Sequence, residues 1–304
     1  MDYETYIDTV TVQIDCNDSV IQKMILNDLL NYISTFGFYA DSKDVYQNKP
    51  TDIVKIEYSL YANKTTLLTI NTGSSRTIVN GYAVIRYYIS VKFAGLKSYN
   101  DDADQQSNNI LAFICAYLNS NQIVFKFTEL DVAIDTNVSF EHMLAICTKK
   151  SPKTNYWRVG EPQTYENQTT YIENIEESKR NKAILRSYLY DKRLKEGLSY
   201  NITRFEIKLQ SAFFNKYGFD ITPIQNALHR YHVMYFEDIE IKSSKIDAYN
   251  NYKNPQRREI KRLGFEEYRL YPNMAYIASF IDYLLHIYYD RDFGVIYHSP
   301  IRSY

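Results

Sequence analysis

Two stretches of the chain repeat the same pattern, and this internal similarity constrains the fold more than any other feature. Residues Val10 to Met24 read VTVQIDCNDSVIQKM, and residues Leu130 to Leu144 read LDVAIDTNVSFEHML. In both, an alternating strand runs into a capped helix. The chain therefore reads as two copies of strand, helix and antiparallel strands, with chance similarity between short amphipathic segments as the alternative. The gapless alignment contains five identical pairs: Val12/Val132, Ile14/Ile134, Asp15/Asp135, Asn17/Asn137 and Ser19/Ser139.

The two copies differ in their acidic residues. The segment YYISVKF of the first copy resembles RFEIKL of the second, so each copy closes on an alternating strand. In this alignment Asp131 corresponds to Thr11, and Glu206 corresponds to Ser90. Only the second copy is therefore equipped for a metal ion.

The hydrophobic patterns predict an α+β protein with a duplicated antiparallel β-sheet core, helices packed on the sheets and a helical C-terminal extension. Residues 1–120 form the first pseudo-repeat, 121–212 the catalytic pseudo-repeat and 213–304 the mostly helical extension. Helices are predicted at Ser19 to Ser34, Asp104 to Leu118 and Phe140 to Thr148. Strands are predicted at Tyr6 to Asp15, Ile53 to Tyr61, Thr65 to Thr72, Gly81 to Phe93, Ile123 to Asp135, Thr169 to Asn174, Ile184 to Lys192 and Ile202 to Leu209.

Composition excludes several classes of protein. With 45% hydrophobic residues, 23% charged residues, nine Gly and seven Pro, the chain is neither collagen-like nor disordered. The amino terminus does not resemble a secretory signal, and the three cysteines (Cys16, Cys115 and Cys147) form no CxxC pair, which favours reduced thiols in the cytoplasm. The apolar stretch from Met274 to Tyr289 contains Asp282 and is shorter than the roughly 20 residues of a spanning helix, so we expect a buried helix and no membrane contact.

Positive charge is concentrated in two segments, although the net charge is −1. Seven basic residues lie between Ser178 and Lys195, against the single acid Asp191, and five lie between Lys253 and Arg262, against Glu259. Such clusters neutralise phosphates locally, while solvated basic faces are the alternative. The 31 tyrosines are weak evidence for stacking on DNA bases, because an AT-rich genome accounts for them equally well.

Carboxylates gather on one face of the strand FTELDVAID. Alternation sends Leu130, Val132 and Ile134 into the core and places Glu129, Asp131, Ala133 and Asp135 on the other face. In TRFEIKL the same rule aligns Arg204, Glu206 and Lys208. Mg²⁺ and Mn²⁺ prefer oxygen ligands, so the acids predict a metal site; a solvated acidic face balanced by nearby Lys and Arg is the alternative.

A nucleophile candidate lies between these strands, in ILRSYLYDK. Arg186, Tyr188, Tyr190 and Lys192 share a face there with Ile184. A phenol with an ordinary pKa of about 10 is a poor nucleophile near neutral pH, so it needs a polarised phosphate and a nearby cation. Lys192 is placed to supply that cation. The alternative is that the tyrosines only pack, as a tyrosine on a strand more often does.

The order of the segments LDVAID, TYIE, SYLYDK and TRFEIKL resembles the Rep_trans family of rolling-circle replication initiators, which also includes relaxases of mobile elements. That family shows an Asp-x-x-x-Asp strand preceded by Thr-Arg, a Tyr-x-Gly strand, an Arg-x-Tyr-(Asn/Asp)-Lys strand with the nicking tyrosine, and an Arg-x-Glu strand. The resemblance covers about Phe127 to Leu209, and its specificity lies in the order and spacing of the motifs. It implies these roles: Asp131, Asp135 and Glu206 as acids of the metal site, Tyr190 as nucleophile and Lys192 close to it.

Three positions depart from the family pattern. Glu129 and Tyr188 stand where the family has Arg, and Glu173 stands where it has Gly. Glu129 is either an extra metal ligand or a competitor of phosphate, and Arg186 is a candidate replacement for the missing cation. Tyr188 remains a second candidate nucleophile, with Tyr190 favoured because it directly precedes Asp191.

The sequence therefore predicts a replication initiator that nicks one DNA strand with Tyr190 and Mg²⁺ or Mn²⁺, leaving a 5′-phosphotyrosyl strand. The alternatives are a conjugative or mobilisation relaxase and a non-catalytic DNA-binding protein of the same fold. Origin DNA, single-stranded or supercoiled, is the expected partner; a helicase and a second copy of this chain are further candidates. No nucleotide-binding, zinc-protease or serine-hydrolase motif occurs, and the histidines of His229-Arg-Tyr-His232 are expected to be satisfied or exposed.

Overall fold

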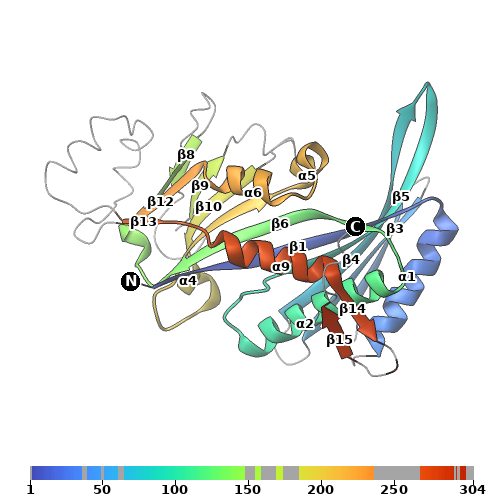
Figure 1. The fold of residues 1–304 in the computed structure, drawn as a ribbon, viewed down its shortest axis with the longest axis horizontal. Coiled ribbons are helices and arrows are strands. Elements are labelled where there is room, and N and C mark those ends of the chain that lie inside the picture. Colours follow the sequence, from blue (N-terminus) through green and yellow to red (C-terminus); the bar gives the residue numbers. More distant parts are fainter. Residues whose placement is uncertain are drawn as a thin grey trace, which may run out of the picture. The chain divides into compact units, whose positions relative to one another are not determined.

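The chain forms two compact units in the computed structural model (Figure 1). Unit 1 contains Met1–Ile7 and Asp131–Ile277, and unit 2 contains Asp8–Leu130 and Ala278–Tyr304. Strands β1 (Tyr3–Cys16) and β6 (Phe125–Thr136) contribute residues to both units. The predicted boundaries near residues 120 and 212 stay a prediction. The structure describes residues 2–35, 40–48, 51–60, 65–147, 155–158, 169–173, 185–235, 268–290, 292 and 295–298.

Unit 2 is built on an antiparallel sheet. Its strands follow the order β2-β3-β4-β5-β1-β6. A tight Asn80-Gly81 turn joins β4 to β5, and both residues have positive φ (51° and 81°), as the two-residue turn of a twisted hairpin requires. The remaining strands of this unit are β2 (Ala40–Asn48), β3 (Thr51–Leu60), β4 (Thr65–Val79) and β5 (Tyr82–Ala94).

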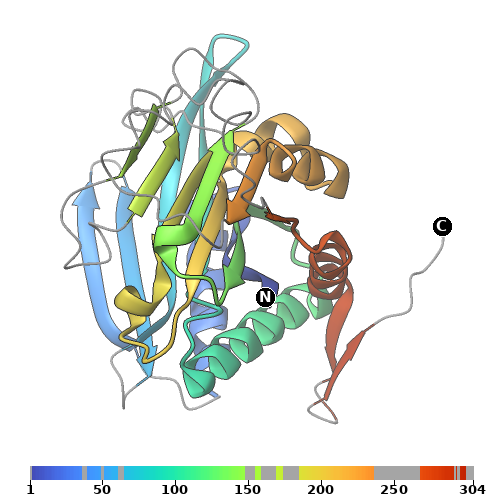
Figure 2. The ribbon, with the colours of Figure 1, turned by 90° about the vertical axis from the view of Figure 1, so that its left-hand side faces the viewer.

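Two helices pack on one side of these strands (Figure 2). Helix α1 (Ser19–Ser34) begins where the Asp18 side chain accepts hydrogen bonds from two backbone N–H groups, and α2 (Asp101–Ser120) has three acids in its first turn. Both confirm the predicted helices, with α2 longer at each end. The core between helices and sheet is apolar: Val10, Val12, Ile14, Val91, Phe93, Leu29, Ile33, Leu111 and Ile114 are all buried.

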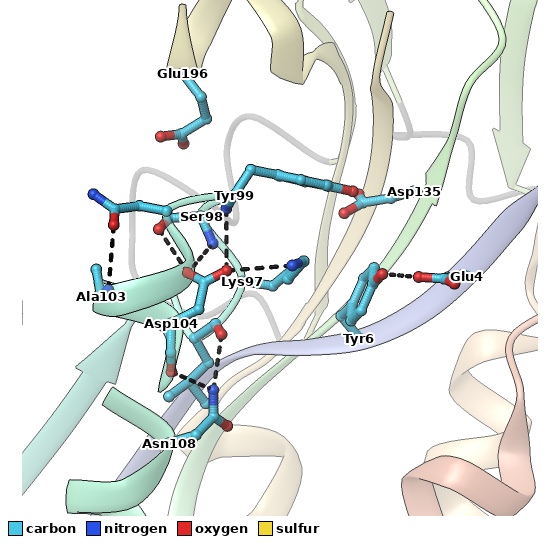
Figure 3. Close-up of polar contacts among 12 residues, drawn as sticks. Glu4, Tyr6, Lys97, Ser98, Tyr99, Ala103, Asp104, Asn108, Asp135 and Glu196 are labelled. Carbon is cyan, nitrogen blue, oxygen red and sulfur yellow. Dashed lines mark hydrogen bonds and ion pairs between the residues drawn. The ribbon is translucent and has the colours of Figure 1, made fainter. Parts of the chain in front are cut away.

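The turn from β5 into α2 is fixed by a buried carboxylate (Figure 3). Asp104 accepts hydrogen bonds from the backbone N–H of Ser98 (2.7 Å) and of Tyr99 (3.2 Å) and from the Ser98 hydroxyl (2.7 Å). Lys97 completes the group with an ion pair of 3.4 Å. These bonds hold Tyr99 at a positive φ of 63°, a conformation that costs energy for a residue with a side chain.

Unit 1 continues from β6 with an antiparallel run of strands in the order β6-β11-β10-β9-β8. These are β11 (Thr203–Leu209), β10 (Leu185–Asp191), β9 (Thr169–Glu173) and β8 (Asn155–Arg158). The α+β class and the antiparallel sheet are thus confirmed, whereas the duplication stays a prediction.

The apolar face of these strands is covered within unit 1. Val132, Leu189, Phe205 and Ile207 are buried, and the Phe205 and Tyr231 rings lie 5.7 Å apart. Tyr231 belongs to a second sheet, ordered β13-β12-β7, with β7 (Met143–Cys147), β12 (Tyr231–Tyr235) and β13 (Tyr268–Leu270). Short helices complete the unit: α4 (Lys192–Glu196), α5 (Ser211–Tyr217) and α6 (Ile221–Leu228).

One predicted helix is wrong. Phe140–His142 is a single 3₁₀ turn (η1), and the chain then continues as β7 rather than as a helix to Thr148. The Ser139 hydroxyl donates to Glu141 and caps no backbone group. Pairing of β7 with the distant strand β12 overrides the local helical pattern.

The described part of the C-terminal tail contains both helices and strands. Helix α9 (Met274–His286) is followed by the hairpin of β14 (Ile287–Asp290) and β15 (Val295–His298). The expectation of a buried helix is wrong, because only Ile277 and Leu284 of α9 are buried. In the part of the chain that the structure describes, no helix combines the length and apolarity of a membrane span.

Candidate functional site

The candidate site lies on three neighbouring strands of unit 1. Strand β11 lies between β6 and β10, and its register with β10 pairs Tyr188 with Glu206 and Tyr190 with Arg204. Paired residues of an antiparallel ladder project to the same face. The tyrosines of β10 therefore share a face with the alternate polar residues of β11, as the alternation in the sequence predicts.

A lysine ammonium links two of the predicted acids. Lys208 Nζ donates a hydrogen bond to Asp131 and lies 3.7 Å from Glu206 Oε1. Asp131 is fully buried, Glu206 is 7% exposed, and the Lys208 side chain is 19% exposed. Strands β6 and β11 thus bring Asp131 and Glu206 to one cation, and that cation belongs to the chain itself.

The second acid of β6 is held by an arginine. Arg204 donates from Nε to Asp135 Oδ1 and from a terminal nitrogen to Oδ2, both at 2.6 Å. Both side chains are buried, Arg204 completely and Asp135 to 97%. A bidentate pair of this kind matches the fork of the guanidinium to both carboxylate oxygens. The alternation in TRFEIKL placed Arg204 on this face, but nothing in the sequence indicated its partner.

Tyr190 contacts the site through its hydroxyl. It donates a hydrogen bond of 3.0 Å to Glu206 Oε2, and the side chain is 5% exposed. Lys195 Nζ lies 5.3 Å from the centre of the Tyr190 ring, within the range of a cation–π contact. The sequence indicates Lys195 only as part of a basic cluster. Tyr188 is half-buried and lies opposite Glu206 in the register, so it shares the face of Tyr190.

Lys192 lies just beyond the end of β10, one residue outside the strand rather than at its predicted last position. The strand ends at Asp191, whose carboxylate accepts the Leu194 N–H at 3.0 Å and caps α4. Lys192 is the first residue of that helix, is buried, and its ammonium donates to Glu196 at 2.7 Å. Arg186 lies on β10 opposite Lys208, and its side chain lies outside the described residues.

Glu129 lies in unit 2, where it is bound by residues of the first predicted copy. Lys92 Nζ lies 2.8 Å from Glu129 Oε2, and the Thr11 hydroxyl donates to the same oxygen at 3.1 Å. Thr11 and Lys92 face each other across β1 and β5. Glu129 is therefore paired with the ammonium of Lys92, as Asp131 is paired with that of Lys208.

The acids fit a divalent metal only in part. Among the residues that the structure describes, no three His, Cys, Asp or Glu side chains are arranged to hold a metal ion. Asp131 and Glu206 nevertheless converge on one positive charge, and Mg²⁺ is often bound by one or two carboxylates together with substrate phosphates. A metal ion there would have to displace Lys208 from Asp131, and Asp135 and Glu129 would likewise have to release Arg204 and Lys92.

Several other predicted features lie at or beyond the limits of the described residues. The segment Lys253 to Arg262, most of the basic residues before Lys192, and the side chains of Glu173, His232 and Cys147 are outside them. His229 ends α6 and is exposed, as expected. Cys16 and Cys115 are buried free thiols, and burial raises the pKa of both.

Comparisons with known proteins give a structural likeness at low sequence identity. No family model matches the chain, and no curated protein matches it. Among solved structures, the chain is similar to a rolling circle replication initiator protein from Geobacillus stearothermophilus, with a TM-score of 0.38 and 12% identity over 81% of this chain and 91% of that chain. Because so low a TM-score does not establish a common fold, the proposals below are based on the chain's own residues.

Proposed function

We propose that the protein initiates DNA replication by nicking one strand, with Tyr190 as the nucleophile. The observation that carries the proposal is the hydrogen bond from the Tyr190 hydroxyl to Glu206 Oε2. A nucleophile needs a base within hydrogen-bond reach, and a carboxylate at 3.0 Å meets that requirement. Tyr190 is preferred to Tyr188 because it directly precedes Asp191, the position of the nicking tyrosine in the resembled family.

The chemistry follows from these two groups. Glu206 accepts the phenolic proton as the Tyr190 oxygen attacks the phosphorus of one phosphodiester. The bond from phosphorus to the 3′-oxygen breaks, and that oxygen takes up a proton and leaves as a 3′-hydroxyl. The product is a DNA strand whose 5′-phosphate is joined to Tyr190. In the reverse reaction the 3′-hydroxyl attacks that phosphotyrosyl bond and rejoins the DNA.

Asp131 and Glu206 are the residues that would hold Mg²⁺ or Mn²⁺. Such an ion would supply charge stabilisation at the phosphate oxygens. The two oxygens of Glu206 face different groups, since Oε2 accepts from Tyr190 and Oε1 lies toward Lys208. One carboxylate can therefore serve the nucleophile and the cation position together.

Burial of the nucleophile adds a requirement. With Tyr190 only 5% exposed, DNA reaches the hydroxyl only after the segments that cover it move. Among the described elements, helix α4 is a candidate for this movement, because its Lys195 lies over the Tyr190 ring. In that position Lys195 would also meet the incoming phosphate.

The test is nicking of a supercoiled plasmid that carries the DNA flanking this gene, followed as conversion to open circles. Glu206→Gln keeps the size of the side chain and removes the base, so nicking should fall by about 10²–10⁴-fold. Tyr188→Phe is the matched control and should retain activity. Undiminished nicking by a folded Glu206→Gln protein would remove Glu206 from the mechanism.

A second candidate is a non-catalytic DNA-binding protein. It is favoured by the cations found on the proposed acids: Lys208 on Asp131, Arg204 on Asp135 and Lys92 on Glu129. Ion pairs of this kind stabilise a fold without doing chemistry. Retained plasmid binding with no nicking in any divalent metal would support this candidate. A relaxase would share the proposed chemistry, and the genes beside this one would separate transfer from replication.

A further inference from the structure

The hairpin of β4 and β5 continues beyond the rest of the unit 2 sheet as a two-stranded ribbon (Figure 1). Strand β3 pairs with β4 only as far as Asn71, and β1 pairs with β5 only as far as Tyr87. From Ser75 to Arg86 the two strands pair with each other around the Asn80-Gly81 turn. An isolated two-stranded ribbon is marginally stable in water.

Both faces of this ribbon are open to solvent. Every residue from Ser75 to Arg86 whose side chain the structure describes is exposed. The exposed side chains include five large apolar ones: Ile78 at 77%, Val79 at 43%, Tyr82 at 78%, Val84 at 37% and Ile85 at 40%. Apolar groups concentrated on one exposed element mark a binding site.

The charge of the ribbon is positive. No Asp or Glu occurs between residues 58 and 100, whereas Arg76 and Arg86 lie on the ribbon itself. The register pairs Arg76 with Ile85 and Arg86 with Ser75, so the two arginines are on adjacent ladder pairs and hence on opposite faces. Each face thus carries one arginine toward the sheet and apolar side chains toward the tip.

We propose that this ribbon, residues 75–86, binds duplex DNA by entering a groove with its tip first. The major groove is wide enough for a two-stranded β-ribbon. Arg76 lies three residues from the tip pair of Val79 and Tyr82, which is about 10 Å at the usual rise of a strand. A major groove is about 8.5 Å deep, so the arginines reach the phosphates when the tip reaches the base edges.

The two ends of the ribbon have different roles in this arrangement. Arg76 and Arg86 contact phosphates of the two strands and set affinity without reading sequence. Ile78, Val79 and Tyr82 meet the base edges, where apolar side chains contact the methyl group of thymine. The proposal rests on the proposed function only in taking DNA as the partner, because the ribbon belongs to unit 2 and contains no residue of the acid site.

The test measures binding of the full-length protein to a fluorescein-labelled duplex by anisotropy at several salt concentrations. Arg76→Gln and Arg86→Gln should each weaken binding and reduce the slope of log K against log salt by about 0.9, the value for one phosphate contact. Lys216→Gln removes the same charge from an exposed position on α5 of unit 1, which does not contain the ribbon, and should leave the slope unchanged. Tyr82→Ser should weaken binding with the slope preserved.

Three outcomes would overturn the proposal. The first is an unchanged slope in the double variant of Arg76 and Arg86, and the second is an equal loss in Lys216→Gln. The third is an Ile78→Thr protein that binds DNA like the wild type but has a different oligomeric state by light scattering. That result would mean that the ribbon is a contact between copies of the chain. Binding is measured in EDTA, where the divalent metal proposed for nicking is removed, so failure of the nicking chemistry and failure of the ribbon are separable.

Discussion

Replacing Asp135 by Asn should destabilise the protein, and the sign of the change separates two accounts of the acid site. Asp135 accepts two bonds of 2.6 Å from Arg204, and the two side chains are 3% and 0% exposed. Breaking a buried ion pair on one side costs about 3–5 kcal/mol, because the remaining charge is left uncompensated. An Asn oxygen can retain one of the two bonds, so we expect about 3 kcal/mol.

The assay is urea unfolding in EDTA, with the slope of free energy against denaturant checked for constancy. Asp15→Asn is the control, since its pair with Lys126 joins side chains that are 55% and 47% exposed and should contribute at most about 1 kcal/mol. The double change Asp135→Leu with Arg204→Met should recover most of the loss. If Asp135→Asn without metal is instead as stable as the wild type or more so, the result would contradict this reasoning. It would favour a site in which the carboxylates repel one another until a metal ion binds.

Three further predictions follow from described contacts. Lys208→Met should make Mn²⁺ raise the unfolding temperature more than in the wild type, because the ammonium no longer competes for Asp131; the same shift in Lys92→Met would contradict this. Thr11→Ala loses one hydrogen bond to Glu129, so it should nick normally and lose about 1 kcal/mol of stability in urea unfolding. Burial raises the pKa of the Cys115 thiol well above its usual value, so iodoacetamide at about pH 8.5 should label Cys115 only after unfolding, as peptide mass mapping would show.

Alternation predicted which residues share a face, and it did so because the side-chain period of a strand is fixed by geometry. Arg204, Glu206 and Lys208 were aligned correctly from the sequence, as were Asp131 and Asp135. Their environment was not predictable in the same way. A polar face ordinarily lies in solvent, whereas Asp131 and Arg204 are both fully buried. Their burial depends on pairing between strands that are distant in sequence.

The errors have the same origin. The segment after Ser139 has a helical pattern, yet β7 forms because β12 is available to pair with it. Lys192 looks like the next residue of an alternating strand, but Asp191 ends that strand by capping α4. Tyr188 and Tyr190 are equivalent by alternation, and the hydrogen bond from Tyr190 to Glu206 could not be predicted from the sequence.

The most direct test of the central claim is the identity of the residue that becomes joined to DNA. Protein, Mn²⁺ and single-stranded DNA from the region flanking the gene are mixed, denatured and digested, and the peptides are examined by mass spectrometry. The account predicts a nucleotide joined through phosphate to Tyr190, present in Tyr188→Phe and missing in Tyr190→Phe. A nucleotide on Tyr188, or an adduct that persists in Tyr190→Phe, would contradict it.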